Sequence, residues 1–220
     1  QVPNFYISDY HKNLRIVKIK YNGKNINADL QAFALKKRSP SVLSNKIKSR
    51  LSGLNLYKDA KVLIIGGSRG IGSWVAKIIG LLAGEVTITY LICEKEAFDV
   101  CDVINSNSNN LHAKSCKFDV KSDDYSKTFN QKYDYLFYFA TPKIFNKESK
   151  YFDKNLYHSF KQFYYNAFSD ISLNFIKKGG SKIFYPSSIA VEQNINGLEE
   201  YKLAKLEGEK YCNKLISKYP

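Results

Sequence analysis

The sequence predicts an α/β fold built on a doubly wound parallel sheet, and three observations lead to this prediction. From residue 58 onward, short runs rich in Val, Ile and aromatic residues alternate with segments of helical periodicity. A glycine cluster lies directly between the first of these runs and the first helical segment. The runs recur at the spacing of βαβ units, in which a crossover helix joins two parallel strands.

Five runs have the length and composition of strands. They are short, β-branched or aromatic, and bounded by turn residues, which favours buried strands of such a sheet. The first of them, Lys-Val-Leu-Ile-Ile, ends at the glycine cluster. The predicted strands are residues 61–65, 85–92, 112–118, 133–140 and 181–185.

Four further segments carry apolar side chains at helical spacing. In the first, Trp74, Ile78 and Leu82 fall on one face of a helix. The third is long and rich in aromatic residues, and Gly179-Gly180 are expected to end it, since glycine commonly ends helices. The predicted helices are residues 71–82, 97–104, 151–177 and 197–218.

Residues 1–57 follow a different pattern and are expected to form an extension separate from the domain at residues 58–220. Residues 14–21 alternate in part between apolar and polar side chains, as a half-exposed strand does. Asn22-Gly23 is a tight-turn signal, and the residues after it, 26–35, permit either a returning strand or a helix. A basic linker at residues 36–50 follows, so the extension is expected to be a hairpin with a tether.

The net charge of +14 is concentrated in the N-terminal quarter of the chain. Residues 1–57 hold 11 Lys/Arg and 2 Asp/Glu, whereas residues 58–220 hold 23 and 18. A basic surface attracts nucleic acid, acidic membranes or an acidic protein. Because a lysine-rich composition without recognition motifs is typical of a solvated face, nucleic acid is not an expected partner.

The sequence contains no sign of a membrane span or of a metal site. No apolar run approaches the roughly 20 residues that a span needs, and no leader with a cleavage site is present, so a cytoplasmic protein is expected. The cysteines form no Cys-x-x-Cys pair, and the three histidines do not cluster near them. Reduced thiols and no metal are therefore expected.

The glycine cluster has the setting of a phosphate-binding loop. Between a strand and a helix, glycines let backbone amides approach a phosphate, and the helix N-terminus adds partial positive charge. This setting favours a phosphate site over an ordinary glycine-rich turn. The cluster is Gly66-Gly67-Ser68-Arg69-Gly70-Ile71-Gly72.

At this point the chain resembles the short-chain dehydrogenase/reductase family. The family's pattern is Thr-Gly-x-x-x-Gly-x-Gly, matched here by Gly66, Gly70 and Gly72, with Ile65 in place of the threonine. The resemblance covers residues 58–220 and implies a Rossmann-type domain with a bound nicotinamide cofactor. The loop residues expected at that cofactor are Gly66, Ser68, Arg69, Gly70, Ile71 and Gly72.

The resemblance also implies cofactor contacts after the third and fourth strands. Asp119 would contact the adenine ring and Val120 would help to wall its pocket, although an Asp at this point also suits a cap of the following turn. After the fourth strand, where the family has Asn-Asn-Ala-Gly, this chain keeps only Ala140.

The residues around the cofactor site favour NADP over NAD. An acid at the end of the second strand would bind the ribose hydroxyls and repel a 2′-phosphate, but residues 90–93 contain none and the next acid is Glu94. Arg69 lies in the glycine loop, where related enzymes often place an arginine on the 2′-phosphate, and a guanidinium suits such a bidentate contact. The alternative is an Arg69 that simply faces solvent.

Tyr201 and Lys205 form a Tyr-x-x-x-Lys pair inside a predicted helix. A spacing of four puts both side chains on one face, one turn apart. A phenol ordinarily keeps its proton up to about pH 10, and a nearby ammonium favours the phenolate. Tyr201 can then act as general acid in a reduction or base in an oxidation. The resemblance implies that both residues also border the cofactor, with Lys205 on the nicotinamide ribose.

Ser188 is expected to complete the catalytic set. It lies 13 residues before Tyr201, the family's serine-to-tyrosine spacing, and its hydroxyl would stabilise negative charge on the substrate oxygen. Ser187 is the alternative if the register differs by one, and either serine also suits a cap of the next segment. Many family members add a helix asparagine, for which Asn166 is preferred over Asn155.

The leading hypothesis is an NADP-dependent ketoreductase or alcohol dehydrogenase that acts on a small-molecule or carrier-bound carbonyl and forms homo-oligomers. Residues 1–57 resemble, without any motif, the last strands of a hot-dog acyl-thioester domain, which would suit a 3-oxoacyl group on an acidic carrier protein. The alternatives are a nucleotide-sugar epimerase or dehydratase and a non-catalytic NADP sensor or scaffold. Relatives continue beyond the catalytic helix, so the domain is expected to lack its C-terminal substrate-binding part.

Overall fold

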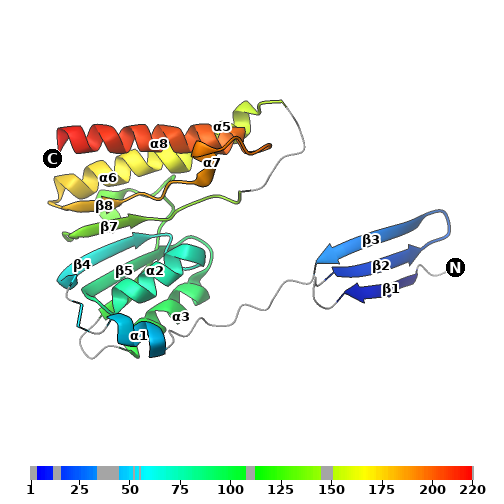
Figure 1. Ribbon diagram of the computed structural model, residues 1–220, viewed down its shortest axis with the longest axis horizontal. Helices are drawn as coiled ribbons and strands as arrows, with labels where there is room; N and C mark the ends of the chain where they lie inside the picture. The colour runs from blue at the N-terminus through cyan, green and yellow to red at the C-terminus, as the bar shows by residue number, and fades with distance from the viewer. Residues whose placement is uncertain are drawn as a thin grey trace. The chain divides into compact units, whose positions relative to one another are not determined.

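The structure is a computed structural model that describes residues 4–11, 16–33, 45–51, 53–54, 56–107, 112–144 and 151–219. Its backbone contacts divide the chain into two units, residues 1–41 and residues 42–220. Each unit contains a sheet of its own (Figure 1).

The larger unit confirms the predicted α/β class. Its five strands are all parallel and lie in the order β6-β5-β4-β7-β8. This order runs outward from β4 in both directions, so the sheet is doubly wound and has a topological switch point between β4 and β7. The strands are β4 (Tyr57–Ile65), β5 (Ala83–Tyr90), β6 (His112–Lys117), β7 (Tyr135–Tyr138) and β8 (Lys182–Phe184).

Helices cover both faces of this sheet (Figure 1). Helices α2 and α3 pack on one face, and α4, α6 and α8 pack on the other. The helical segments are α1 (Asn45–Leu51), α2 (Gly70–Gly80), α3 (Glu94–Asn105), α4 (Tyr125–Thr128), α5 (Lys154–Lys161), the π-helix η1 (Gln162–Ala167), α6 (Phe168–Lys177), α7 (Ile189–Glu192) and α8 (Glu199–Lys218).

The central strand β4 supplies both cores of the unit, because alternate side chains of a strand point to opposite faces. Val62 and Ile64 pack with residues of β5, α2 and α3. Leu63 and Ile65 pack with the aromatic side chains of α4 and α6. All four are fully buried. A strand buried on both faces needs a continuous apolar run, which is the pattern that marked this strand in the sequence.

Several boundaries differ from the prediction. Strand β4 begins at Tyr57, four residues before the predicted start, and β7 is shorter than predicted. Helix α1 lies partly inside the predicted linker, whose first part (36–44) is outside the described residues. Helices α4 and α7 have four residues each, too few to show a periodicity in sequence.

The single long helix predicted at residues 151–177 is divided into α5, η1 and α6. It begins only after Asp153, whose carboxylate accepts hydrogen bonds from the backbone N–H groups of Asn155 (2.9 Å) and Leu156 (3.1 Å). Two tyrosine hydroxyls bond to carbonyls of the π-helical turn: Tyr138 donates to Phe163 O (2.7 Å), and Tyr185 donates to Tyr164 O (3.0 Å). These two hydroxyl groups from outside the helix thus bond at the place where the helix has its wider turn.

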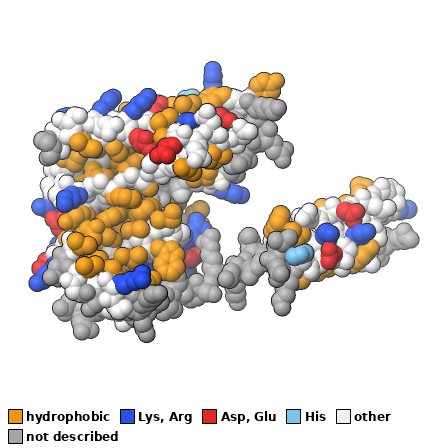
Figure 2. Space-filling model, viewed as in Figure 1, with side chains coloured by type: hydrophobic (Ala, Val, Ile, Leu, Met, Phe, Trp, Pro, Cys, Tyr) orange, Lys and Arg blue, Asp and Glu red, His pale blue; other side chains and the backbone are white. Residues whose placement is uncertain are grey.

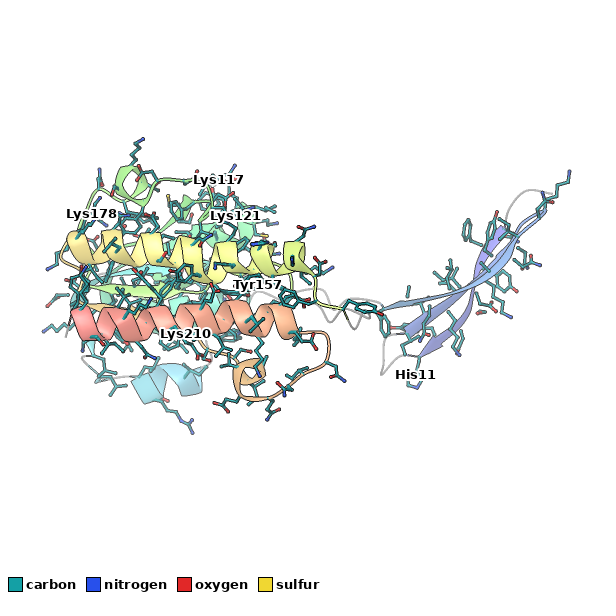
Figure 3. All side chains as sticks on the ribbon, turned by 90° about the horizontal axis from the view of Figure 1, so that it is seen from above. His11, Lys117, Lys121, Tyr157, Lys178 and Lys210 are labelled. Atoms are coloured by element: carbon teal, nitrogen blue, oxygen red, sulfur yellow. The ribbon has the colours of Figure 1, made fainter. Side chains whose placement is uncertain are left out.

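Helix α8 is joined to α5 by polar contacts. Glu207 on α8 accepts a hydrogen bond from the Tyr157 hydroxyl and forms an ion pair with Lys161 at 2.8 Å. Figure 3 shows Tyr157 between the two helices. Burial of Glu207 disfavours its charged form and by itself would raise the pKa of its carboxyl. The contacts with Lys161 and Tyr157 outweigh this effect and keep that pKa below its usual value.

The N-terminal unit is a three-stranded antiparallel sheet in the order β1-β2-β3. Strands β2 (Ile16–Asn22) and β3 (Asn27–Phe33) form the predicted hairpin, and the helical alternative for this segment is wrong. Strand β1 (Asn4–His11) was not predicted, because its exposed residues lack the alternation that marks a strand.

The pairing register gives the N-terminal sheet one apolar and one mostly polar face. The mostly polar face includes Asp9 and Lys18, which are paired across β1 and β2 and form an ion pair at 3.2 Å. Figure 2 shows charged side chains on the side of this sheet that is turned to the viewer. The opposite face is formed by the side chains of Phe5, Ile7, Tyr10, Val17, Ile19, Tyr21, Ala28, Leu30 and Ala32.

Among the described residues, no helix is both long and apolar enough to cross a membrane. The same part of the chain holds no group of three or more side chains arranged to bind a metal ion. The four cysteines form no disulfide.

The fold predicts a large cost for cavities in β4. Ile64→Ala is expected to lower the free energy of unfolding by about 2–5 kcal/mol, because Ile64 is fully buried at the centre of the sheet. The matched control is Ile216→Ala on α8, where the isoleucine is 67% exposed and the change should stay within about 0.5 kcal/mol. Chemical denaturation of both variants measures this, and equal losses would contradict the assignment of β4 as the core strand.

Candidate active site

A cleft of about 400 Å³ lies at the carboxyl ends of β4, β5, β6 and β7. This is the switch point at which doubly wound sheets bind their ligands. Six of the residues predicted to contact a cofactor line it, namely Gly66, Ser68, Arg69, Asp119, Val120 and Ala140.

Two glycines of the loop allow backbones to approach closely at the base of the cleft. Gly66 has φ +78°, and a Cβ at this position would lie 2.8 Å from the carbonyl carbon of Phe139, the residue after β7. A Cβ on Gly72 would overlap the carbonyl oxygen of Gly66. Larger residues at either position would therefore push α2 or β7 away from the loop. Gly70, with φ +57°, faces open space and needs glycine only for its backbone conformation.

The backbone N–H groups of this loop divide into two sets. Gly66 N donates to Thr89 Oγ1 (2.9 Å) and Gly67 N donates to Thr89 O (3.1 Å), so these two amides bind β5. Helix α2 then begins at Gly70 with no capping bond from the Arg69 side chain and no acidic residue in its first turn. The N-terminal amides of α2, which include Ile71, are thus suited to an anion.

Three polar side chains that bear on the predicted cofactor choice lie in or near this cleft. Arg69 is exposed and lines the cleft. Glu94, the first acid after β5, accepts a hydrogen bond from Tyr90 at 2.5 Å. Asp119 also lines the cleft, and one of its oxygens accepts a hydrogen bond from Lys121 N (3.0 Å). The turn-capping role considered for Asp119 is therefore present, alongside its position in the cleft wall.

Tyr201 and Lys205 lie one turn apart on α8 and are both buried. The Tyr201 ring packs edge-on against Phe160 (centroids 5.6 Å apart) and Tyr164 (5.4 Å). The Lys205 ammonium donates a hydrogen bond to the carbonyl oxygen of Pro186 at 2.7 Å. Burial lowers the pKa of Lys205 to about 8, against the opposing influence of Glu209 and Cys212.

The two candidate serines have different partners. Ser188 caps α7 by accepting a hydrogen bond from Ala190 N (3.3 Å). The capping alternative for this serine is thus realised, and because the cap uses the oxygen as acceptor, the O–H group can still act as a donor. Ser187 instead donates to the carboxylate of Glu209. This leaves Ser188 as the better candidate of the two.

Tyr164 connects the cleft to the Tyr201–Lys205 pair. Its hydroxyl is 2.5 Å from Oγ1 of Thr141, which lines the cleft, and its ring contacts Tyr201. Sequence reasoning did not single out Tyr164 or Thr141. A tyrosine in an aromatic helix has no distinguishing signal, since its position depends on the π-helical turn.

The asparagines do not join this group. Asn166 lines a separate polar hollow between α4 and the η1–α6 segment, together with Gln162 and Asp170. Asn155 is exposed in the first turn of α5. Neither asparagine lines the cleft that holds Gly66 and Thr141.

Comparison with solved structures identifies the fold. A protein from Escherichia coli CFT073 assigned as a short chain dehydrogenase, solved with NADPH, superposes with a TM-score of 0.65 at 16% identity over 75% of this chain and 73% of its own. The oxidoreductase yciK from E. coli gives 0.64 at 18% identity over 75% and 72%. Acetoin dehydrogenase from Enterobacter cloacae gives 0.61 at 14% identity over 72% and 70%.

The chain has the short-chain dehydrogenase fold. No protein-family model matches the sequence, and no curated protein matches it either. The likeness is thus one of architecture at 14–18% identity. In this Rossmann-type architecture, Gly66 follows the central strand β4, and Tyr201 and Lys205 lie on α8, the second helix after β8.

The buried ammonium predicts a specific pH dependence of stability. Because the pKa of Lys205 is about 8 in the folded chain and its ordinary value is 10.5, the unfolded chain holds a proton between these values that the folded chain has released. The free energy of unfolding of the wild type, relative to Lys205→Met, should therefore rise with pH in this window, by up to about 1.4 kcal/mol per pH unit.

Urea denaturation of both proteins at pH 7, 8, 9 and 10 measures this difference. When the free energy of unfolding is plotted against pH, the two proteins should give parallel curves below pH 8 and diverging curves above it. The titration of other groups is common to both proteins and cancels in the comparison. Curves that remain parallel throughout would show that Lys205 titrates normally in the folded chain.

Proposed function

We propose that the chain is an NADP(H)-dependent oxidoreductase of the short-chain dehydrogenase type, which interconverts a carbonyl and an alcohol. One observation carries this proposal. The glycine-lined cleft at the switch point is connected, through Thr141 and Tyr164, to a buried Tyr–Lys pair on α8. A cleft suited to a phosphate and a group suited to proton transfer would thus act together.

The residues present fit a dinucleotide cofactor. The backbone cradle formed at Gly66 and Gly72 has no room for a Cβ, and the uncapped N-terminus of α2 suits a phosphate. Asp119, Val120 and Ala140 would wall the adenine and ribose part of the cleft. When bound, the nicotinamide ring would supply a hydride to the carbonyl carbon or accept one from the alcohol.

The proton part of the reaction falls to residues of this chain. In the reducing direction Tyr201 would give its phenolic proton to the substrate oxygen, and Ser188 would donate a hydrogen bond to the same oxygen. The Lys205 ammonium would stabilise the phenolate that remains. In the oxidising direction Tyr201 would take the proton instead.

The substrate class that we propose is a small or carrier-bound carbonyl compound, with a 3-oxoacyl thioester as the leading example. An acidic carrier would suit the basic balance of the chain, which has a net charge of +14. We propose further that residues 58–220 are the catalytic domain, that it works as a homo-oligomer, and that it acts in the cytoplasm.

One observation favours a second candidate, a non-catalytic NADP-binding protein of the same fold. Tyr201 is only 7% exposed, and its ring is enclosed by Phe160 and Tyr164. A protein that only senses the cofactor does not need this phenol to reach a substrate. Cofactor binding without turnover would support this candidate.

The first functional prediction concerns Tyr201→Phe. NADPH absorbance followed with a panel of acyl-thioester, ketone and sugar-nucleotide substrates should show a loss of about 10²–10⁴-fold in kcat, because the proton donor is removed. NADPH binding should be retained. A variant that turns over as fast as the wild type would remove Tyr201 from the mechanism.

The second functional prediction concerns cofactor choice. Arg69→Gln should weaken NADPH binding about tenfold or more, the effect of losing a charge-assisted hydrogen bond, while NADH binding changes little. Lys143→Gln is the matched control, since Lys143 is also exposed at the cleft. Equal weakening of both cofactors by Arg69→Gln would argue against a 2′-phosphate contact.

A further inference from the structure

We infer that Tyr164 and Tyr185 form an aromatic cage that holds the Lys205 ammonium in place one helical turn from Tyr201, and that both tyrosines are positioning residues for the proposed reaction. The inference rests on the proposed function for the use of the ammonium, and on the geometry alone for the cage itself.

The Lys205 ammonium lies between two aromatic rings. Its Nζ is 4.3 Å from the ring centroid of Tyr164 and 4.5 Å from that of Tyr185. Both distances are well within the range of about 6 Å at which the negative face of a ring attracts a cation. Lys205 is only 4% exposed, so the rings and the Pro186 carbonyl replace the water that an exposed ammonium would have.

Each ring of the cage is fixed by its own hydroxyl. Tyr185 donates to the carbonyl oxygen of Tyr164 (3.0 Å), so the two walls are joined through the π-helical turn. The Tyr164 hydroxyl is tied to Thr141 in the cleft (2.5 Å). The position of the ammonium is therefore coupled to the wall of the proposed cofactor cleft.

Gly208 makes room for this cage. It lies in the interior of the 20-residue helix α8, where glycine costs about 1 kcal/mol relative to alanine. A Cβ at this position would overlap the Tyr185 hydroxyl and lie 2.5 Å from the Tyr164 carbonyl oxygen. The Tyr185–Tyr164 hydrogen bond thus accounts for a glycine that the helix itself disfavours.

The rings counteract the cost of burying the charge. The charged or titratable groups that face Lys205 are Glu209 and Cys212 on α8, Tyr164 on η1 and Tyr185 after β8. Burial is the largest influence and favours the neutral amine, whereas a ring face favours the ammonium. Loss of one ring face should therefore lower the pKa of Lys205 further.

The test measures the ionisation of Lys205 directly. The rate of its acetylation by acetic anhydride, followed by peptide mass spectrometry as a function of pH, gives the midpoint of its titration. Tyr164→Leu and Tyr185→Leu should each move this midpoint down by about one pH unit. Tyr164→Phe and Tyr185→Phe retain the ring faces and should leave it near the wild-type value.

Tyr165→Leu is the matched control. Tyr165 lies on the same π-helix, and its ring is close to Lys161 (5.3 Å) and Tyr211 (5.9 Å), with no contact to Lys205 among the described side chains. Its removal should leave the Lys205 midpoint unchanged. The cage is overturned if both leucine variants keep the wild-type midpoint, or if Tyr165→Leu moves it equally.

A second pair of variants covers the case in which the leucine variants do not fold. Phenylalanine and 3,5-difluorophenylalanine at position 164 have nearly the same shape, but fluorine weakens the negative ring face. The cage requires a lower midpoint for the fluorinated variant, and equal midpoints would overturn it.

The catalytic consequence is tested separately from the cage. If the ammonium is needed at Tyr201, the alkaline limb of the kcat–pH profile should shift down with the Lys205 midpoint in Tyr164→Leu and stay in place in Tyr164→Phe. A shifted midpoint in a protein without any turnover would refute the proposed reaction and retain the cage. A shifted midpoint with an unmoved alkaline limb would refute the positioning role.

Discussion

The arrangement of the candidate site depends on a positive charge held away from water. An ammonium in the interior is strongly disfavoured unless other groups replace its hydration. In this chain, two ring faces and the Pro186 carbonyl surround Lys205. The π-helical turn, the hydroxyl bond between Tyr185 and Tyr164 and the absence of a Cβ at Gly208 all serve this one requirement.

A second constraint operates at the switch point, where three backbones meet. The end of β4, the end of β7 and the start of α2 approach so closely that Gly66 and Gly72 cannot carry a side chain. At the edge of the cleft, the N-terminus of α2 has no side-chain cap. Thr141 connects the two constraints, since it lines this cleft and is bonded to Tyr164.

The sequence predicted the features that depend on local pattern or short spacing. The apolar run at residues 62–65 marked a strand, which the structure shows to be the central one, buried on both faces. The loop from Gly66 to Gly72 lies between a strand and a helix, as the sequence predicted. Tyr201 and Lys205 could be paired because four residues make about one helical turn. The features that could not be predicted from the sequence depend on tertiary contacts. The π-helix lies where the hydroxyls of Tyr138 in β7 and Tyr185 after β8 bond to helix carbonyls, and strand β1 is defined by its pairing with β2.

Binding of the cofactor to the intact chain tests the central claim most directly. Isothermal titration with NADPH and with NADH should give saturable binding of one cofactor per chain, with NADPH binding the more tightly. The absence of binding by either cofactor at millimolar concentration, in a chain shown to be folded, would contradict the assignment of the glycine-lined cleft as a nicotinamide dinucleotide site.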